Sequence, residues 1–161
     1  MIPDKLKLAQ LPTPLQFLPR LSAELGGPRI WVKRDDLTGC AASGNKIRKL
    51  EFVLAQAIAE GADTLLTCGG LQSNHCRATA VLGAQLGLKV HLILRGQPPG
   101  QLPDGNLLLA SLAGAEISCY PLSQYQHLPE LFDYWLDFYR SRGRKPFVIP
   151  TGASDGIVAD A

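Results

Sequence analysis

Lys46 and its neighbours are the residues of this sequence whose types and spacing most clearly allow chemistry. The lysine lies in segment 43–46 (Ser-Gly-Asn-Lys), where a loop enters an apolar-periodic helix, and Arg48 and Lys49 follow within one helical turn. Like charge and burial both favour the neutral amine of a lysine, which is its nucleophilic form. Such an amine can bond covalently to an aldehyde cofactor such as pyridoxal phosphate (PLP). The alternative is a basic, solvated first turn of a helix.

A second segment, residues 67–75, leaves a short apolar run and enters another helix. Gly69 and Gly70 would let the backbone approach a ligand closely. Ser73 or Asn74 can cap the following helix. The remaining N–H groups at a helix start bind anions such as a carboxylate or a phosphate. Plain N-capping, with glycines for the geometry of the turn, explains the same residues equally well.

This second segment lacks two common site patterns. It has no GxGxxG spacing, so nucleotide binding by a Rossmann-type domain is weakly supported. It has no GxSxG spacing either, which argues against the nucleophile elbow of a hydrolase. Ser73 and His75 are two positions apart and cannot face each other on a helix, so a Ser–His pair is not expected.

The composition is that of an ordinary globular domain. Its 161 residues are 46% hydrophobic and 19% charged, which suits one domain with a real core. A net charge of +2 is too small to favour nucleic acid or a membrane surface as a partner. Without a signal-peptide pattern or a bilayer-length apolar stretch, we expect a cytoplasmic protein. The cysteines expected to be reduced, with no metal bound, are Cys40, Cys68, Cys76 and Cys119.

Hydrophobic periodicity and glycine positions predict an α/β fold. Helices are expected at 19–25, from 45 to a stop at Gly61, and at 73–86, 106–113 and 128–140. Short apolar runs predict strands at 30–33, 63–68, 89–94, 116–120 and 147–149. Strands that alternate with helices of this length specify an open, twisted parallel sheet with helices on both faces.

Several segments, in order, resemble the D-cysteine desulfhydrase and aminocyclopropane-carboxylate (ACC) deaminase family, which are PLP enzymes of the tryptophan-synthase-β fold type. The similarity runs along nearly the whole chain. It is carried by segments 12–15, 33–38, 44–46, 48–52, 61–64 and 72–75 and by Arg77. The resemblance implies a PLP-dependent lyase for a small amino-acid substrate, and a homodimer in the full-length members.

The resemblance also implies roles for single residues. Lys46 would be the Schiff-base lysine and would remove the Cα proton, Lys49 would help hold the cofactor phosphate, and Asn74 would hydrogen-bond the pyridoxal ring hydroxyl. Ser73 would be a second catalytic residue, close to the reacting Cα. The residues expected at the substrate carboxylate are Gln72, Ser73, Asn74 and His75. Elimination from a small D-amino acid such as D-cysteine would then give pyruvate, ammonia and sulfide.

Two features favour a desulfhydrase over an ACC deaminase, which is the second alternative. His75 stands where the deaminases tend to carry glutamine. Segment 94–97 lacks the tryptophan that is typical of deaminases near this position.

The chain departs from the family pattern in two ways. Ser43 stands where the family usually has glycine, which would restrict the loop. Family members are also longer, and the chain would correspond to their N-terminal half. Residues 1–48 would begin the large PLP domain, and 49–161 would form the small α/β domain. The later phosphate loop and the partner of the pyridine nitrogen would be absent, which leaves open a truncated or non-catalytic remnant, or an enzyme completed by another polypeptide.

Overall fold

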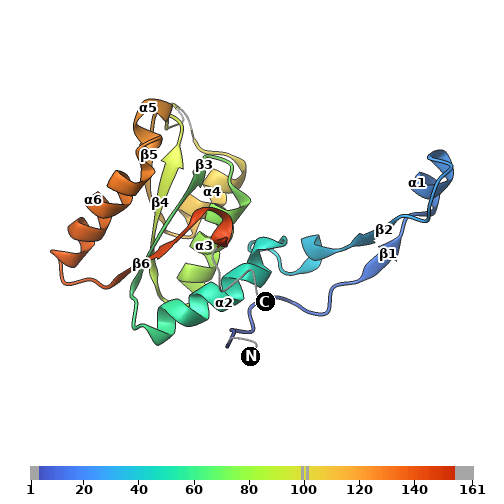
Figure 1. Cartoon of the computed structure of the whole chain (residues 1–161), viewed down its shortest axis with the longest axis horizontal. Helices are drawn as coiled ribbons and strands as arrows, with labels where there is room; N and C mark the ends of the chain where they lie inside the picture. Colours follow the sequence, from blue (N-terminus) through green and yellow to red (C-terminus); the bar gives the residue numbers. More distant parts are fainter. Residues whose placement is uncertain (1–3, 99, 101, 155–161) are drawn as a thin grey trace.

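The structure is a computed structural model that describes residues 4–98, 100 and 102–154. It contains a four-stranded parallel sheet with helices on both faces, and an arm that extends away from this main body (Figure 1). The expected α/β class and open parallel sheet are therefore confirmed. Among the residues described, no helix has the length and apolar character needed to cross a membrane.

Strands and helices alternate along the main body. The strands are β3 (Thr64–Gly70), β4 (Lys89–Arg95), β5 (Glu116–Tyr120) and β6 (Pro146–Ile149). The helices are α2 (Lys46–Ala59), α3 (Asn74–Gln85), α4 (Gly105–Leu112), α5 (Leu122–Tyr125) and α6 (Leu128–Arg140). The elements expected here are present, with ends that differ by one or two residues. The exception is α5, which is too short to produce a periodic pattern and is not predicted by the sequence.

The strand order of the sheet is β5-β4-β3-β6, and all neighbouring strands are parallel. The chain adds β4 and β5 on one side of β3 and then returns to add β6 on the other side. The strand order therefore reverses between β3 and β6, and open α/β sheets bind ligands beyond the carboxyl ends of the strands at such a point. Residues 71–75 leave β3 at this point.

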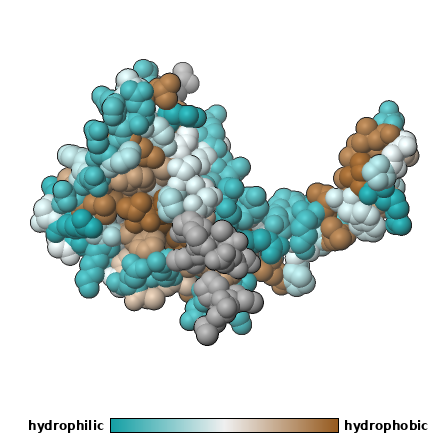
Figure 2. All heavy atoms as spheres, viewed as in Figure 1, coloured by the Kyte–Doolittle hydropathy of each residue, from teal (hydrophilic) through white to brown (hydrophobic). Residues whose placement is uncertain are grey.

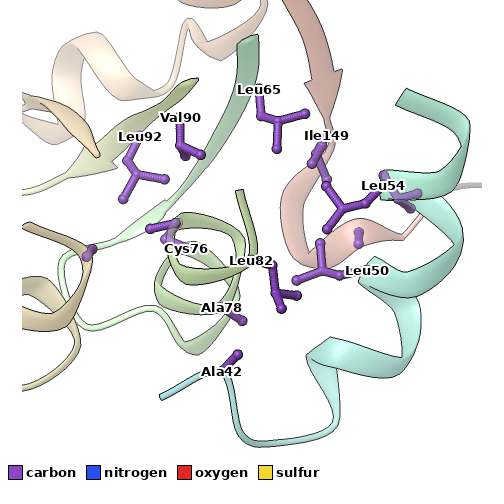
Figure 3. Close-up of a cluster of buried hydrophobic side chains, with 14 of the residues drawn as sticks. Ala42, Leu50, Leu54, Leu65, Cys76, Ala78, Leu82, Val90, Leu92 and Ile149 are labelled. Carbon is purple, nitrogen blue, oxygen red and sulfur yellow. The ribbon is translucent and has the colours of Figure 1, made fainter. Parts of the chain in front are cut away.

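Alternate residues of β4 lie on opposite faces of the sheet. Val90 and Leu92 belong to the core cluster that α2 and α3 complete (Figure 3). His91 lies on the opposite face, with its ring centroid 4.1 Å from that of Trp135 and 5.8 Å from that of Tyr139. Because both aromatic residues belong to α6, the period of two along β4 places helices on both sides of the sheet.

The core layer between the sheet and helices α2 and α3 is mainly aliphatic. Leu50 and Leu54 of α2 and Leu82 of α3 are buried in it (Figure 3). Helix α3 can lie close to β4 because Gly83 has no side chain, and a Cβ at this position would overlap Val90 Cγ2. This close packing fixes α3, and therefore its first turn, against the sheet.

The arm consists of β1 (Leu15–Phe17), α1 (Pro19–Glu24) and β2 (Trp31–Lys33), followed by the 3-10 turn η1 (Asp35–Leu37). Strand β1 pairs antiparallel with β2. The expected helix at 19–25 and strand at 30–33 are confirmed, whereas β1 is not predicted because nearby prolines hide its short pattern. Apolar residues form patches on the arm, mainly toward its far end, between polar ones (Figure 2). Leu15 is 62% exposed and Leu25 63%.

Candidate functional site

Lys46 is the first residue of α2, and the loop before it is tightly organised. The hydroxyl of buried Thr38 donates to the carbonyl of Asp35 (2.8 Å) and accepts from the N–H of Gly44 (3.0 Å). Gly44 has a φ of 108°, which a side chain would strain. Ser43 does not share this positive φ. A serine at position 43 therefore causes no backbone strain of this kind.

The guanidinium of Arg48 lies beside Asp35 of η1, the turn that follows the arm. Its guanidinium donates to both carboxylate oxygens of Asp35, at 2.7 and 2.8 Å. This bidentate pair lowers the pKa of Asp35 to about 2. Of the two cations expected beside Lys46, Arg48 is therefore paired with a carboxylate.

Arg77 of α3 joins the lysine loop to the second segment. Its buried guanidinium donates to the carbonyl of Ala41 and, at 2.9 Å, to that of Ser43. The same group lies 3.4 Å from Asn74 Oδ1. Burial lowers the pKa of this guanidinium, and the acceptors around it offset the cost of desolvation. The two candidate segments thus form one site, held together by a residue that the sequence indicated only as part of a motif.

The start of α3 has the capped geometry that the sequence predicts. Ser73 is the N-cap residue, and its Oγ accepts from the N–H of Cys76 at 3.2 Å. The N–H groups of Asn74 and His75 make no hydrogen bond within the described part of the chain. Together with the helix dipole, such free donors favour an anion. Gly69 makes room for this turn, because a Cβ there would lie 2.8 Å from Ser73 Oγ.

His75 is buried beneath this helix start, with 3% of its surface exposed. Its Nε2 lies 2.8 Å from Thr67 Oγ1, and that hydroxyl donates to the carbonyl of Ile149, also at 2.8 Å. His75 Nε2 must therefore be the donor, which leaves Nδ1 as a buried acceptor without a partner among the described residues. Desolvation, reinforced by the charges of Lys46 and Lys49, lowers the pKa of His75 to about 4. The backbone N–H of His75, which makes no hydrogen bond within the described residues, can donate to a ligand.

Gln72 fastens the loop after β3 to α4. Its Nε2 donates to Asp104 Oδ1 (2.9 Å), and its Oε1 accepts from the backbone N–H of Asn106 (2.8 Å). A Cβ at Gly105 would lie 2.6 Å from that Oε1, so the glycine allows the contact. The nitrogen and the oxygen of the Gln72 amide thus both make hydrogen bonds, so this side chain stabilises the loop.

Lys49 lies one turn after Lys46 and reaches the end of the β6 loop. Its Nζ donates to Ser154 Oγ at 3.1 Å. Ser154 follows the 3-10 turn η2 (Thr151–Ala153), and Thr151 Oγ1 is 3.1 Å from Cys68 Sγ of β3. The loops after β3 and β6 therefore lie beside each other, with Lys49 between α2 and the second loop. Residues 155–161 lie outside the described residues.

The cysteines form no separate site. All four are free: Cys68 and Cys76 are buried, Cys119 is half-buried and Cys40 is exposed. Burial raises the pKa of Cys76 to about 12, so its thiol stays protonated and unreactive. Within residues 4–98, 100 and 102–154, no three histidine, cysteine or acidic side chains are arranged to hold a metal ion.

The donors present fit a cofactor that carries an aldehyde, an anionic group and a ring oxygen, as PLP does. Lys46 supplies a primary amine and Lys49 a second cation. Asn74 Nδ2 has no hydrogen-bond partner in the part of the chain that the structure describes, so it can donate to a ring oxygen. The first turn of α3 supplies free N–H groups for a further anion. No side chain at Gly69 obstructs this turn.

Comparisons with known proteins agree with this chemistry. The family model described as "Pyridoxal-phosphate dependent enzyme" matches residues 6–159. A putative ACC deaminase of Thermotoga maritima is 48% identical over 155 residues, which are 96% of this chain and 49% of that protein. A D-cysteine desulfhydrase of Klebsiella pneumoniae is 44% identical over 161 residues, covering 96% of this chain and 48% of that enzyme. The chain thus spans about half the length of these curated relatives.

Solved structures are also similar to this chain over less than half of their own length. The crystal structure of an ACC deaminase homologue superposes with a TM-score of 0.87 at 38% identity, covering 97% of this chain and 47% of that one. O-ureido-L-serine synthase superposes with a TM-score of 0.64 at 19% identity, covering 87% of this chain and 41% of that one, and this likeness shows the fold alone.

Proposed function

The chain belongs to the pyridoxal-phosphate dependent enzyme family, and on that premise we propose that it is part of a PLP-dependent lyase for a small D-amino acid. The substrate we propose first is D-cysteine, eliminated to pyruvate, ammonia and sulfide. The observation that carries the proposal is the tether of Arg77, which brings the Lys46 loop and the Asn74 helix start into one site.

The proposed tasks follow from where each side chain lies. Lys46 Nζ would hold the cofactor covalently and would accept the Cα proton of the substrate. Lys49 would contact the phosphate, and Asn74 Nδ2 would donate to the ring oxygen. When bound, PLP supplies an electron sink for the charge that develops at Cα.

The start of α3 is the proposed place for the substrate carboxylate. The free N–H groups of Asn74 and His75 would donate to it, assisted by the helix dipole. Ser73 Oγ already accepts from the helix, so its own proton is available for a ligand close to Cα. We propose that the side chains of Gln72 and His75 support this loop without contacting the carboxylate, since both are committed to other partners.

ACC deaminase activity is the second candidate, favoured by the names of two of the proteins compared above. The two activities are separated by measuring sulfide released from D-cysteine and ammonia released from ACC. Sulfide without ammonia from ACC supports the desulfhydrase, and the reverse result replaces it with the deaminase.

We also propose that residues 1–48 begin a larger domain and that 49–161 form the small α/β domain. Supporting this, the arm carries exposed apolar side chains. Its base is tied to α2, since Glu51 Oε1 accepts from the N–H groups of Leu8 and Ala9, both at 2.8 Å. A cytoplasmic homodimer is the assembly proposed for the complete enzyme, and light scattering measures its mass.

Covalent trapping tests the cofactor assignment directly. The purified chain is mixed with PLP, reduced with borohydride, digested and analysed by mass spectrometry. We expect the label on Lys46, its loss in Lys46→Ala, and a label on Lys46 with weaker PLP affinity in Lys49→Ala. Label on another lysine, or no label, overturns the assignment. A labelled chain that releases no sulfide or pyruvate from D-cysteine supports the alternative of a non-catalytic remnant.

A further inference from the structure

A chain of amide groups links α4 to the start of α3. Asn106 Nδ2 donates to the backbone carbonyl of Gln72 (2.9 Å) and to Asn74 Oδ1 (3.0 Å). The backbone N–H of Asn106 donates to Gln72 Oε1 (2.8 Å). This single residue of α4 therefore contacts both the backbone of the loop and the side chain proposed to meet the cofactor ring.

Two groups of fixed polarity decide which way these amides point. The Gln72 carbonyl can only accept, so Asn106 must direct its NH2 group toward it. The Arg77 guanidinium can only donate, and it lies 3.4 Å from Asn74 Oδ1. Asn106 Nδ2 and the Arg77 guanidinium are therefore both donors, and Asn74 must direct its Oδ1 toward them. A reversed Asn74 amide would set its NH2 group against two other donors.

We infer that Asn106 is a positioning residue that keeps the Nδ2 donor of Asn74 directed to the cofactor. With Oδ1 engaged by Asn106 and Arg77, the donor end of the Asn74 amide is left for a ligand, and a ring oxygen that carries negative charge requires a donor. The inference rests on the proposed function, because it assumes a cofactor at this site.

Asn106→Asp tests the inference with an isosteric side chain that can only accept. The carboxylate introduced by this substitution should attract the NH2 group of Asn74 and so present Asn74 Oδ1 to the cofactor. We expect PLP affinity to fall by about tenfold, the size of one charge-assisted hydrogen bond. Asn106→Ala, which leaves the Asn74 amide free to turn, should lower PLP affinity by a smaller factor.

The order of the two variants separates positioning from a structural role. An acid in the first turn of α4 is favoured by the helix dipole, so Asn106→Asp should be at least as stable to heat as Asn106→Ala. If Asn106 only supported the fold, the Asn106→Asp variant would therefore bind PLP more tightly than the Asn106→Ala variant. That order of affinities overturns the inference.

A charge-matched exchange controls for the added negative charge. Asp104→Asn combined with Asn106→Asp restores the net charge and keeps an acceptor for Gln72 Nε2. The exchanged pair should bind PLP as weakly as Asn106→Asp, whereas Asp104→Asn alone should bind it like the original chain. Original affinity in the exchanged pair overturns the inference.

NMR of the side-chain amides gives a readout that needs no cofactor. In Asn106→Asp, one amide proton of Asn74 should move downfield as it bonds to the carboxylate. Unchanged Asn74 resonances overturn the inference, whatever the PLP affinity. If the Asn74 amide resonance shifts in Asn106→Asp but PLP does not label the original chain, the proposed function fails. The positioning of Asn74 by Asn106 then still stands.

Discussion

The hydroxyl of Thr67 connects three elements at the centre of the site. It donates to the carbonyl of Ile149 in β6 and accepts from His75 of α3, while Thr67 itself belongs to β3. Because a hydroxyl has one proton, His75 Nε2 must carry a hydrogen. Desolvation then keeps the ring neutral, since it lowers the pKa of His75 to about 4. A buried neutral ring makes the stability of this region sensitive to acid.

Mild acidification should destabilise the fold. Desolvation lowers the pKa of both His75 and His91 to about 4, from an ordinary value of 6.5. Between these values the unfolded chain binds more protons than the folded one, so the free energy of unfolding falls as pH drops from about 6.5 to about 4. Urea unfolding at several pH values measures this slope, which His91→Gln should reduce. A free energy of unfolding that stays constant across the window contradicts the prediction.

A methyl group at Gly69 should damage the site. In Gly69→Ala the new Cβ would lie 2.7 Å from Cys76 Sγ and 2.8 Å from Ser73 Oγ, so the first turn of α3 must shift. We expect a loss of stability of about 1–3 kcal/mol, as for other overpacked positions, together with weaker PLP labelling of Lys46. Gly70→Ala is the matched control, since a Cβ at Gly70 has no neighbour within 4 Å. Similar labelling of the two variants would show that the turn tolerates the methyl group.

At the scale of elements, the site depends on how α2 and α3 are held relative to each other. Helix α2 brings Lys46 and Lys49, and α3 brings the capped helix start. The loop before α2 is tied to α3 through Arg77. The guanidinium can reach two carbonyls at once, which a lysine ammonium on a single flexible stem does less well.

Arg77→Lys should therefore loosen the lysine loop. The carbonyls of Ala41 and Ser43 would share one ammonium group, and we expect faster hydrogen exchange in residues 40–45 and a loss of about 1–3 kcal/mol in stability. Arg140→Lys is the control, because Arg140 lies on the exposed side of α6, 3.9 Å from Asp137. Equal exchange in residues 40–45 for both variants would mean that Arg77 does not hold the loop.

At the scale of the whole molecule, the arm is the part whose surface is unusual. It extends from the main body (Figure 1) and exposes the side chains of Leu15, Leu25 and Trp31. Clustered apolar surface of this kind marks an interaction site. The chain spans about half the length of its relatives, so the proposed occupant is the rest of such an enzyme.

Adding the remaining half of the Thermotoga maritima relative should cover the arm. Trp31 is 47% exposed, and its burial should move the fluorescence emission of the mixture to shorter wavelength. Trp31→Phe should remove this change, because Trp135 belongs to the main body. Separate elution of the two polypeptides with unchanged Trp31 emission would contradict the proposed domain division.

Local sequence patterns alone predicted most of the helices and strands of this protein. The limits of α2, α3 and α6 follow from apolar spacing, capping residues and glycines, which act within a few residues of one another. For the same reason the sequence by itself places Lys46 at a helix start and an N-cap at Ser73 or Asn74, of which the structure shows Ser73. The family resemblance rests on the same short segments.

Tertiary structure decided the rest, because it depends on contacts between residues far apart in the chain. The order β5-β4-β3-β6 places the loops after β3 and β6 side by side, which no local pattern specifies. Packing turned His75 inward and fastened Gln72 to α4, so two side chains expected at the substrate have other partners. It also brought Asn106 to Asn74, where the polarity of distant neighbours sets the direction of one amide.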